Sequence, residues 1–218
     1  MSGGKILPNG RILRYSVKER VIHWIVGLSY LYLLLTGLAF FTPRLYWLAN
    51  LVGGGPTARA WHPWAGVIFA LGVVWMYRIW GKDMRFTDSD RAWFSDVGHY
   101  IRNEDEQVPQ ADRFNGGQKQ LFWLMFWGGL LLLLSGLILW FTEYIPWNLR
   151  LLRYIAVLVH PIAALLTIGG FIIHVYMGTA MERGAFSSMV RGEVSRAWAK
   201  AFHEPWLRQL ESEQTPKK

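Results

Sequence analysis

Two histidines, His160 and His174, lie fourteen residues apart in a stretch from Tyr154 to Met181 that contains no charged residue. Fourteen residues make about four helical turns, so both imidazoles lie near one helix face and about 21 Å apart along its axis. Histidine is scarce inside membrane-spanning helices because its polar ring needs a partner there. Two histidines at two depths therefore predict two stacked metal centres.

The elements that position these residues are predicted to be transmembrane helices. Of the 218 residues, 52% are hydrophobic and only 17% are charged. Four windows without Asp, Glu, Lys or Arg predict spans over approximately 21–43, 60–80, 119–142 and 154–181. A shorter window, 45–58, contains a Gly-Gly-Gly-Pro run and is expected to be an interfacial loop. The expected fold is all-α, an integral membrane four-helix bundle forming a single membrane domain over 1–218.

The distribution of basic residues predicts the orientation. Of the 23 Lys and Arg residues, 19 lie in the N-terminal tail, around the loop 81–118 and in the C-terminal tail 182–218. The positive-inside rule therefore places both termini in the cytoplasm, as in a multi-pass protein of the bacterial inner membrane. The formal charge of +8 indicates this topology and attraction to anionic membrane lipid, not nucleic-acid binding. The absence of cysteine excludes disulfides, iron–sulfur ligation by this chain and c-type haem attachment.

Depth in the membrane pairs four histidines. In this orientation His23 and His174 lie toward the cytoplasmic side, whereas His62 and His160 lie toward the outer side. Each is about 10–13 Å from the midpoint of its helix. Two pairs follow, His23 with His174 and His62 with His160, and each joins two helices as the axial ligands of a haem b iron would. A packing role or a proton relay is the alternative, and two imidazoles alone make a poor zinc site.

Small residues lie one helical turn from each of these histidines: Gly27, Gly66, Ala164 and Gly170. All four are on the ligand's helix face, toward the membrane interior. A porphyrin plane needs such clearance beside a helix. Ordinary packing of small residues between membrane helices remains the alternative.

A faint internal repeat is also present. Residues 33–38, LLLTGL, resemble residues 132–137, LLLSGL, at an offset of 99, and His62-Pro63 recurs as His160-Pro161 at an offset of 98. If this repeat is real, the chain consists of two helix hairpins in parallel. Leucine runs also match by chance, so both interpretations remain open.

A polar segment, Arg113 to Lys119, lies at the cytoplasmic entrance of the third predicted span. Asn115 is well suited to be the N-cap of that helix. Asn115, Gly117 and Gln118 could instead bind a quinone head, with amide donors and exposed backbone facing its carbonyl oxygens. The two remaining histidines, His99 and His203, have no partner pattern and are expected to be solvent-exposed.

From about Arg14 to Trp206 the chain resembles the cytochrome b (gamma) subunit of respiratory membrane-bound formate dehydrogenases. The motifs that support the resemblance are Glu19-Arg20, His23-Trp24, Thr36-Gly37, His62-Pro63 with Gly66, Phe114-Asn115, Gly117-Gln118-Lys119, Ser135-Gly136, His160, His174 with Tyr176, Gly192, Val194-Ser195 and Trp198-Ala199-Lys200. The combination is specific, although no single motif is.

The resemblance implies two b haems, with iron ligands at His23, His62, His160 and His174. It also implies that a quinone, menaquinone or ubiquinone, is reduced beside the cytoplasmic haem at the segment 115–118. The implied partners are an iron–sulfur (beta) subunit on the outer side and a molybdenum- or tungsten-containing catalytic (alpha) subunit. The chain is then an electron-transfer subunit and anchor that does not itself oxidise formate. The alternatives are the cytochrome b subunit of a nickel–iron hydrogenase and a haem-free membrane anchor or transporter.

Overall fold

The computed structural model describes residues 4–102, 104, 108–182 and 184–214. The last residues of the expected C-terminal tail, 215–218, lie outside this range. Backbone contacts group the chain into two compact units. Unit 1 contains the chain up to Val21, the segment Ile79–Phe122 and the chain from Ile173, and unit 2 contains Ile22–Arg78 and Trp123–Ile172. The single membrane domain expected over 1–218 stays a prediction.

Four long apolar helices confirm the expected spans. They are α1 (Val17–Phe41), α2 (Gly55–Trp80), α5 (Gly116–Trp140) and α6 (Arg150–Tyr176), the last continued by the π-helical turn η5 (Met177–Met181). Each is long and apolar enough to cross a membrane. Each also begins three to five residues before the charge-free window that predicted it. The extra turns contain charged residues, because a helix can continue beyond the hydrocarbon core. Some of these residues, such as Lys18 and Arg150, are exposed, whereas Glu19 and Lys119 are buried in ion pairs.

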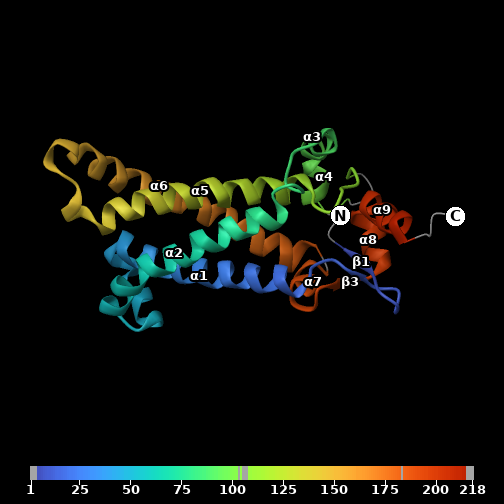
Figure 1. Ribbon diagram of the computed structural model, residues 1–218, viewed down its shortest axis with the longest axis horizontal. Coiled ribbons are helices and arrows are strands. Elements are labelled where there is room, and N and C mark those ends of the chain that lie inside the picture. The colour runs from blue at the N-terminus through green and yellow to red at the C-terminus, as the bar shows by residue number, and fades with distance from the viewer. Residues whose placement is uncertain (1–3, 103, 105–107, 183, 215–218) are drawn as a thin grey trace. The chain divides into compact units, whose positions relative to one another are not determined.

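In unit 2 the four helices pack side by side (Figure 1). Tyr30 of α1 contacts the ring of Phe69 on α2, with centroids 5.4 Å apart, and donates a hydrogen bond of 3.0 Å to Thr167 of α6. A Cβ atom on Gly128 would lie 2.5 Å from Thr167, and one on Gly129 would lie 3.1 Å from Phe69. The two glycines therefore let α5 approach its neighbours closely, as small residues do between membrane helices.

The connections of unit 2 are short helical turns. The 3-10 helix η1 (Pro43–Val52) follows α1, and Gly53 and Gly54, both at positive φ, lead into α2. This segment does not form a span, as expected. Two further 3-10 turns, η3 (Thr142–Tyr144) and η4 (Trp147–Leu149), connect α5 to α6.

Unit 1 folds the two tails and the central loop into one core. A small antiparallel sheet has the strand order β1 (Lys5–Ile6), β2 (Ile12–Leu13), β3 (Glu193–Val194). The helices are α3 (Asp88–Ser95), α4 (Val97–Ile101), α7 (Ala185–Arg191), α8 (Arg196–Phe202) and α9 (Glu204–Gln214). Ile12, Val194 and Trp206 belong to a buried apolar cluster that joins the sheet to α8 and α9.

Candidate functional site

In unit 2, His62 of α2 and His160 of α6 face each other. Their ring centroids are 6.4 Å apart, and the ring planes differ by 62°. Two imidazoles bound to opposite sides of one metal ion, with metal–nitrogen bonds of about 2 Å, have centroids about 6 Å apart. The structure therefore brings together the pair that depth in the membrane predicted, at a separation suited to axial ligation.

A hydroxyl group orients each of these imidazoles. Thr36 Oγ1 lies 2.6 Å from Nδ1 of His62, and Ser135 Oγ lies 2.9 Å from Nδ1 of His160. Each hydroxyl also donates to the carbonyl oxygen four residues earlier in its own helix, at 2.8 and 2.6 Å. Because the hydroxyl proton is used there, the oxygen accepts the Nδ1–H of the ring. That tautomer leaves Nε2 as the nitrogen that can bind a metal.

Glycines leave room beside these helices. A Cβ atom on Gly27 would meet nothing within 4 Å, and one on Gly66 would meet only Leu33 Cδ2, at 4.0 Å. The clearance that the sequence predicted is present at both positions. A Cβ atom on Gly136 would lie 3.2 Å from the ring of His160, so this glycine accommodates the imidazole itself.

The donor set fits haem. Two imidazoles fill only two coordination positions, and a porphyrin supplies the four equatorial nitrogens that an octahedral iron needs besides them. Among the described residues, no group of three or more His, Asp or Glu side chains is arranged to hold a metal ion. A bis-histidine haem site therefore fits these residues better than a site built from protein ligands alone.

The other two predicted ligands lie near the start of α1 and near the end of α6. His23 is half-buried and has an edge-on contact with the ring of Trp24, with centroids 5.5 Å apart. His174 lies in the last turn of α6, and its side chain is exposed. The two residues belong to different compact units, and their pairing stays a prediction.

The predicted quinone segment forms a helix cap. The Gln118 N–H donates to Asn115 Oδ1 at 2.9 Å, and the Asn115 N–H donates to Gln118 Oε1 at 3.2 Å. This capping box confirms that Asn115 caps α5. Both side-chain oxygens are used, so the NH₂ groups of both amides remain as donors for another partner.

The glycines of this segment accommodate an indole. A Cβ atom on Gly116 or Gly117 would lie 2.9 Å from the ring of Trp93, a residue of α3. Asn115 lines a small cavity, and the lining of that cavity does not include Gly117 or Gln118. The assignment of Gly117 and Gln118 to a quinone site stays a prediction.

Several basic residues of unit 1 are buried in ion pairs. The Arg113 guanidinium donates to Glu19 at 2.6 Å and to Asp83 at 3.1 Å. Lys119 lies 2.7 Å from Asp90, and both side chains are almost completely buried. These cations therefore hold α1, α3 and α5 together at this end, in addition to any effect on topology. Removing one partner of such a pair typically destabilises a protein by about 3–5 kcal/mol.

A family model described as prokaryotic cytochrome b561 matches residues 14–192. This chain belongs to the prokaryotic cytochrome b561 family. It is therefore a multi-pass membrane cytochrome, and the family binds haem b.

Named relatives of this cytochrome agree with the resemblance drawn from its motifs. The cytochrome b556(fdo) subunit of formate dehydrogenase from Escherichia coli is 33% identical over 91% of this chain and 93% of its own length. The nitrate-inducible b556(Fdn) subunit from the same organism is 29% identical, over 94% of each chain. A formate dehydrogenase cytochrome b556 subunit from Haemophilus influenzae is 30% identical, over 96% of this chain and 87% of its own. The resemblance to formate dehydrogenase cytochrome b subunits is confirmed.

One expectation for this cytochrome is wrong. His203 was expected to be solvent-exposed, but it is only 1% exposed. Its Nδ1 is hydrogen-bonded to the carbonyl oxygen of Asp112, and its ring packs against Trp198. Burial and the nearby Arg14 guanidinium hold the pKa of His203 well below its usual value. The expectation failed because the C-terminal tail folds into the core of unit 1. The same expectation for His99 is met only in part, since His99 is half-buried and its Nδ1 lies 2.5 Å from Glu104 Oε2.

The hydroxyls that orient the histidines were not identified from the sequence. The repeat could have pointed to them, because Thr36-Gly37 and Ser135-Gly136 are its most distinctive part. The structure supports this repeat, because both hydroxyls contact the repeated histidines in the same way. The repeat also extends further back, since Ser16 and Glu19 form a capping box at the start of α1 as Asn115 and Gln118 do at α5.

Proposed function

We propose that this cytochrome is the di-haem b subunit of a membrane-bound formate dehydrogenase. It would relay electrons from a partner subunit to quinone and anchor the complex in the membrane. The observation that supports this most directly is the facing pair His62 and His160, each oriented by a hydroxyl group. The relatives align with nearly the whole chain, and their names favour a formate dehydrogenase over a hydrogenase as the complex to which this chain belongs.

Four histidines would hold the two haems. His62 and His160 would bind one through Nε2, while Thr36 and Ser135 keep the proton on Nδ1. His23 and His174 would bind the second, an assignment supported by their depth along the helices. Bound haem supplies one-electron carriers at two depths of the membrane. The protein fixes their axial ligands and provides the clearance at Gly27 and Gly66.

The quinone, menaquinone or ubiquinone, would bind beside Asn115, Gly117 and Gln118. The capping box supports this role because it fixes both amides while leaving their NH₂ groups available. An amide N–H can donate to a quinone carbonyl oxygen and stabilises the negative charge that develops there on reduction.

The orientation follows from the basic residues. With both termini in the cytoplasm of a bacterium and the spans in its inner membrane, the segment 115–118 faces the cytoplasm. An iron–sulfur (beta) subunit, with a molybdenum- or tungsten-containing catalytic (alpha) subunit, would dock on the outer side. Electron entry outside and proton uptake inside would then generate membrane potential.

Haem content tests the ligand assignment. We expect about two haem b per chain in the detergent-purified protein, measured as the pyridine haemochrome against protein mass. His174→Ala and His62→Ala should each lower this value toward one. His99→Ala is the matched control and should leave it unchanged, since His99 bonds to Glu104 outside the spans.

The outcomes separate the alternatives. A folded wild-type protein without haem would exclude electron relay and favour a haem-free anchor or transporter. A haem content that His174→Ala leaves at the wild-type value would exclude the pair His23/His174. Co-purification with a molybdenum or tungsten subunit rather than a nickel–iron subunit identifies the complex as formate dehydrogenase.

A further inference from the structure

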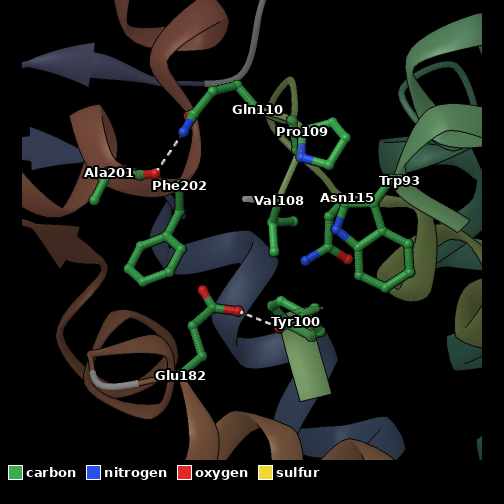
Figure 2. A pocket seen from close by; sticks show the side chains of 10 residues that line it. Trp93, Tyr100, Val108, Pro109, Gln110, Asn115, Glu182, Ala201 and Phe202 are labelled. Atoms are coloured by element: carbon green, nitrogen blue, oxygen red, sulfur yellow. Dashed lines mark hydrogen bonds between the residues drawn. The ribbon is translucent and has the colours of Figure 1, made fainter. Parts of the chain in front are cut away.

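A small cavity in unit 1 joins the cap of α5 to the protein surface. Its lining includes Asn115 at the start of α5, Tyr100 of α4 and Glu182 at the end of η5 (Figure 2). Gln110 and Ala201, which are exposed, line it as well. The cavity has room for about one or two water molecules rather than for a quinone ring.

Glu182 is a buried carboxylate at this cavity. It is 6% exposed, and the hydroxyl of Tyr100 donates to its Oε2 at 3.1 Å. The charged and titratable groups that face it also include Arg14, whose Nη1 is 4.0 Å from its Oε1, and Tyr15, with which it interacts electrostatically. A buried carboxylate needs such partners, because an isolated charge away from water is costly.

The position of Glu182 suggests more than anchoring. It directly follows a π-helical turn, and its N–H donates to the carbonyl of Met177, five residues earlier. Such turns are frequent at functional sites. Figure 2 shows the side chains of Glu182, Tyr100 and Asn115 around the same space, with a hydrogen bond between the first two. A titratable carboxyl group thus lines the same cavity as the exposed Gln110 and as Asn115, the residue proposed to bind quinone.

We propose that Glu182, with Tyr100 and cavity water, delivers protons to the quinone that is reduced beside Asn115. This inference rests on the proposed function, which supplies the electrons and the quinone. Reduction of one quinone to quinol takes two electrons from the haem side and two protons. Each proton leaves the Glu182 carboxyl for a carbonyl oxygen of the quinone by way of the cavity, and the carboxylate is reprotonated from water at the Gln110 surface.

A structural role for Glu182 is the competing explanation. In that case Glu182 serves only to pair with Arg14, and its replacement changes stability but not proton transfer. Glu182→Gln separates the two roles, because the amide keeps the shape and can still accept from Tyr100 but cannot release a proton. Tyr100→Phe provides a second variant that keeps the ring and removes the hydroxyl.

The experiment uses the complex as it is purified from the membrane. Its haems are reduced with dithionite under anaerobic conditions, and their reoxidation by a short-chain ubiquinone or menaquinone analogue is followed in the stopped flow across a range of pH. Redox-induced infrared difference spectra record carboxyl protonation independently of turnover. Glu211→Gln is the matched control, since Glu211 forms a surface ion pair with Arg196. Haem content and visible spectra establish that each variant has assembled.

If the proposal is correct, Glu182→Gln slows reoxidation by about tenfold or more, as loss of a general acid does. Wild-type rates should fall as pH rises through the ionisation of the donor, because only the protonated carboxyl gives a proton, and this step should vanish in the variant. A carboxyl C=O band should also disappear from the infrared difference spectrum. Tyr100→Phe should slow reoxidation less, and Glu211→Gln should match wild type.

Two results would overturn the proposal in different ways. If Glu182→Gln and Tyr100→Phe reoxidise at the wild-type rate at every pH and keep the infrared band, Glu182 does not deliver protons, although the proposed function stands. If reduced wild-type haems are not reoxidised by either quinone, the proposed function itself fails and the role of Glu182 fails with it.

Discussion

Replacing Ser135 by alanine removes only the hydroxyl that orients His160. Without that acceptor for its Nδ1–H, the imidazole is a weaker donor to iron and is less firmly oriented. We expect haem affinity at this site to fall by about 10–100-fold, as it does when outer-shell partners of metal ligands are lost. The midpoint potential of the haem that still binds at this site should rise, because a weaker imidazole donor stabilises the oxidised iron less. Potentiometric titration and haem content measure both effects.

Ser29→Ala is the matched control for this change. Ser29 also donates to a carbonyl oxygen within its own helix, at 3.0 Å. A potential that shifts equally in both variants would mean that the hydroxyl of Ser135 serves the helix and not the histidine.

The buried His203 predicts a pH-dependent stability. Its pKa in the folded protein is well below its usual value because of burial and the nearby Arg14, whereas in the unfolded chain it is near the ordinary value of about 6.5. Below about pH 6.5 the unfolded chain therefore binds more protons, and stability falls as the pH falls. We expect the melting temperature of the holoprotein to decrease from about pH 6.5 to pH 5, and His203→Asn to lessen that decrease.

Asparagine can still donate to the carbonyl of Asp112, so the variant keeps part of the native contact. The control is His99→Asn, which changes a half-buried histidine in the same way. An undiminished pH dependence in His203→Asn would show that other groups cause it.

At the scale of elements, the clearance beside α1 can be filled. Gly27 lies four residues after His23, and a Cβ atom there would meet nothing within 4 Å. Gly27→Leu should therefore leave the helices assembled but occupy the space proposed for a porphyrin. We expect haem content to fall from about two to about one per chain, with circular dichroism and elution volume unchanged.

Gly169→Leu tests whether this effect depends on position. A Cβ atom on Gly169 would also meet nothing within 4 Å. Gly169 lies nine residues after His160 and therefore on the opposite face of α6. Retention of both haems in Gly27→Leu would show that the glycine serves only the packing of helices.

The helices were predictable from the sequence because a span is a local signal. A charge-free window of about twenty residues is sufficient to predict each one. The sheet of unit 1 could not be predicted in this way. Its strands have two residues each, and Ile12 pairs with Val194, far away in the chain. The proximity of His62 and His160 was predictable from depth, whereas Glu182 and Tyr100 have no local pattern that brings them to one cavity.

At the scale of the whole molecule, the absence of cysteine makes the topology directly testable. Glu143→Cys places a thiol at the exposed turn η3, and Ser212→Cys places one on the exposed side of α9. We expect a membrane-impermeant maleimide to label the first in intact spheroplasts and the second only after lysis. The opposite labelling pattern would invert the orientation and move the segment 115–118 to the outer side.

The internal repeat has a consequence in terms of symmetry. In a two-fold arrangement, a residue that contacts its own counterpart lies on the axis. Within unit 2, His62 and His160 are such counterparts. Within unit 1, so are Arg14 and Arg113, which exchange guanidinium-to-carbonyl hydrogen bonds of 3.0 and 2.8 Å.

His23 and His174, the other proposed pair, are not counterparts of each other, since the counterpart of His23 is Phe122 and that of His174 is Met76. Two identical halves would bind one haem on the axis or, with histidine at every off-axis position, three haems. A chain that holds two haems, as proposed, must have halves that differ, so the two haems would lie in unlike surroundings.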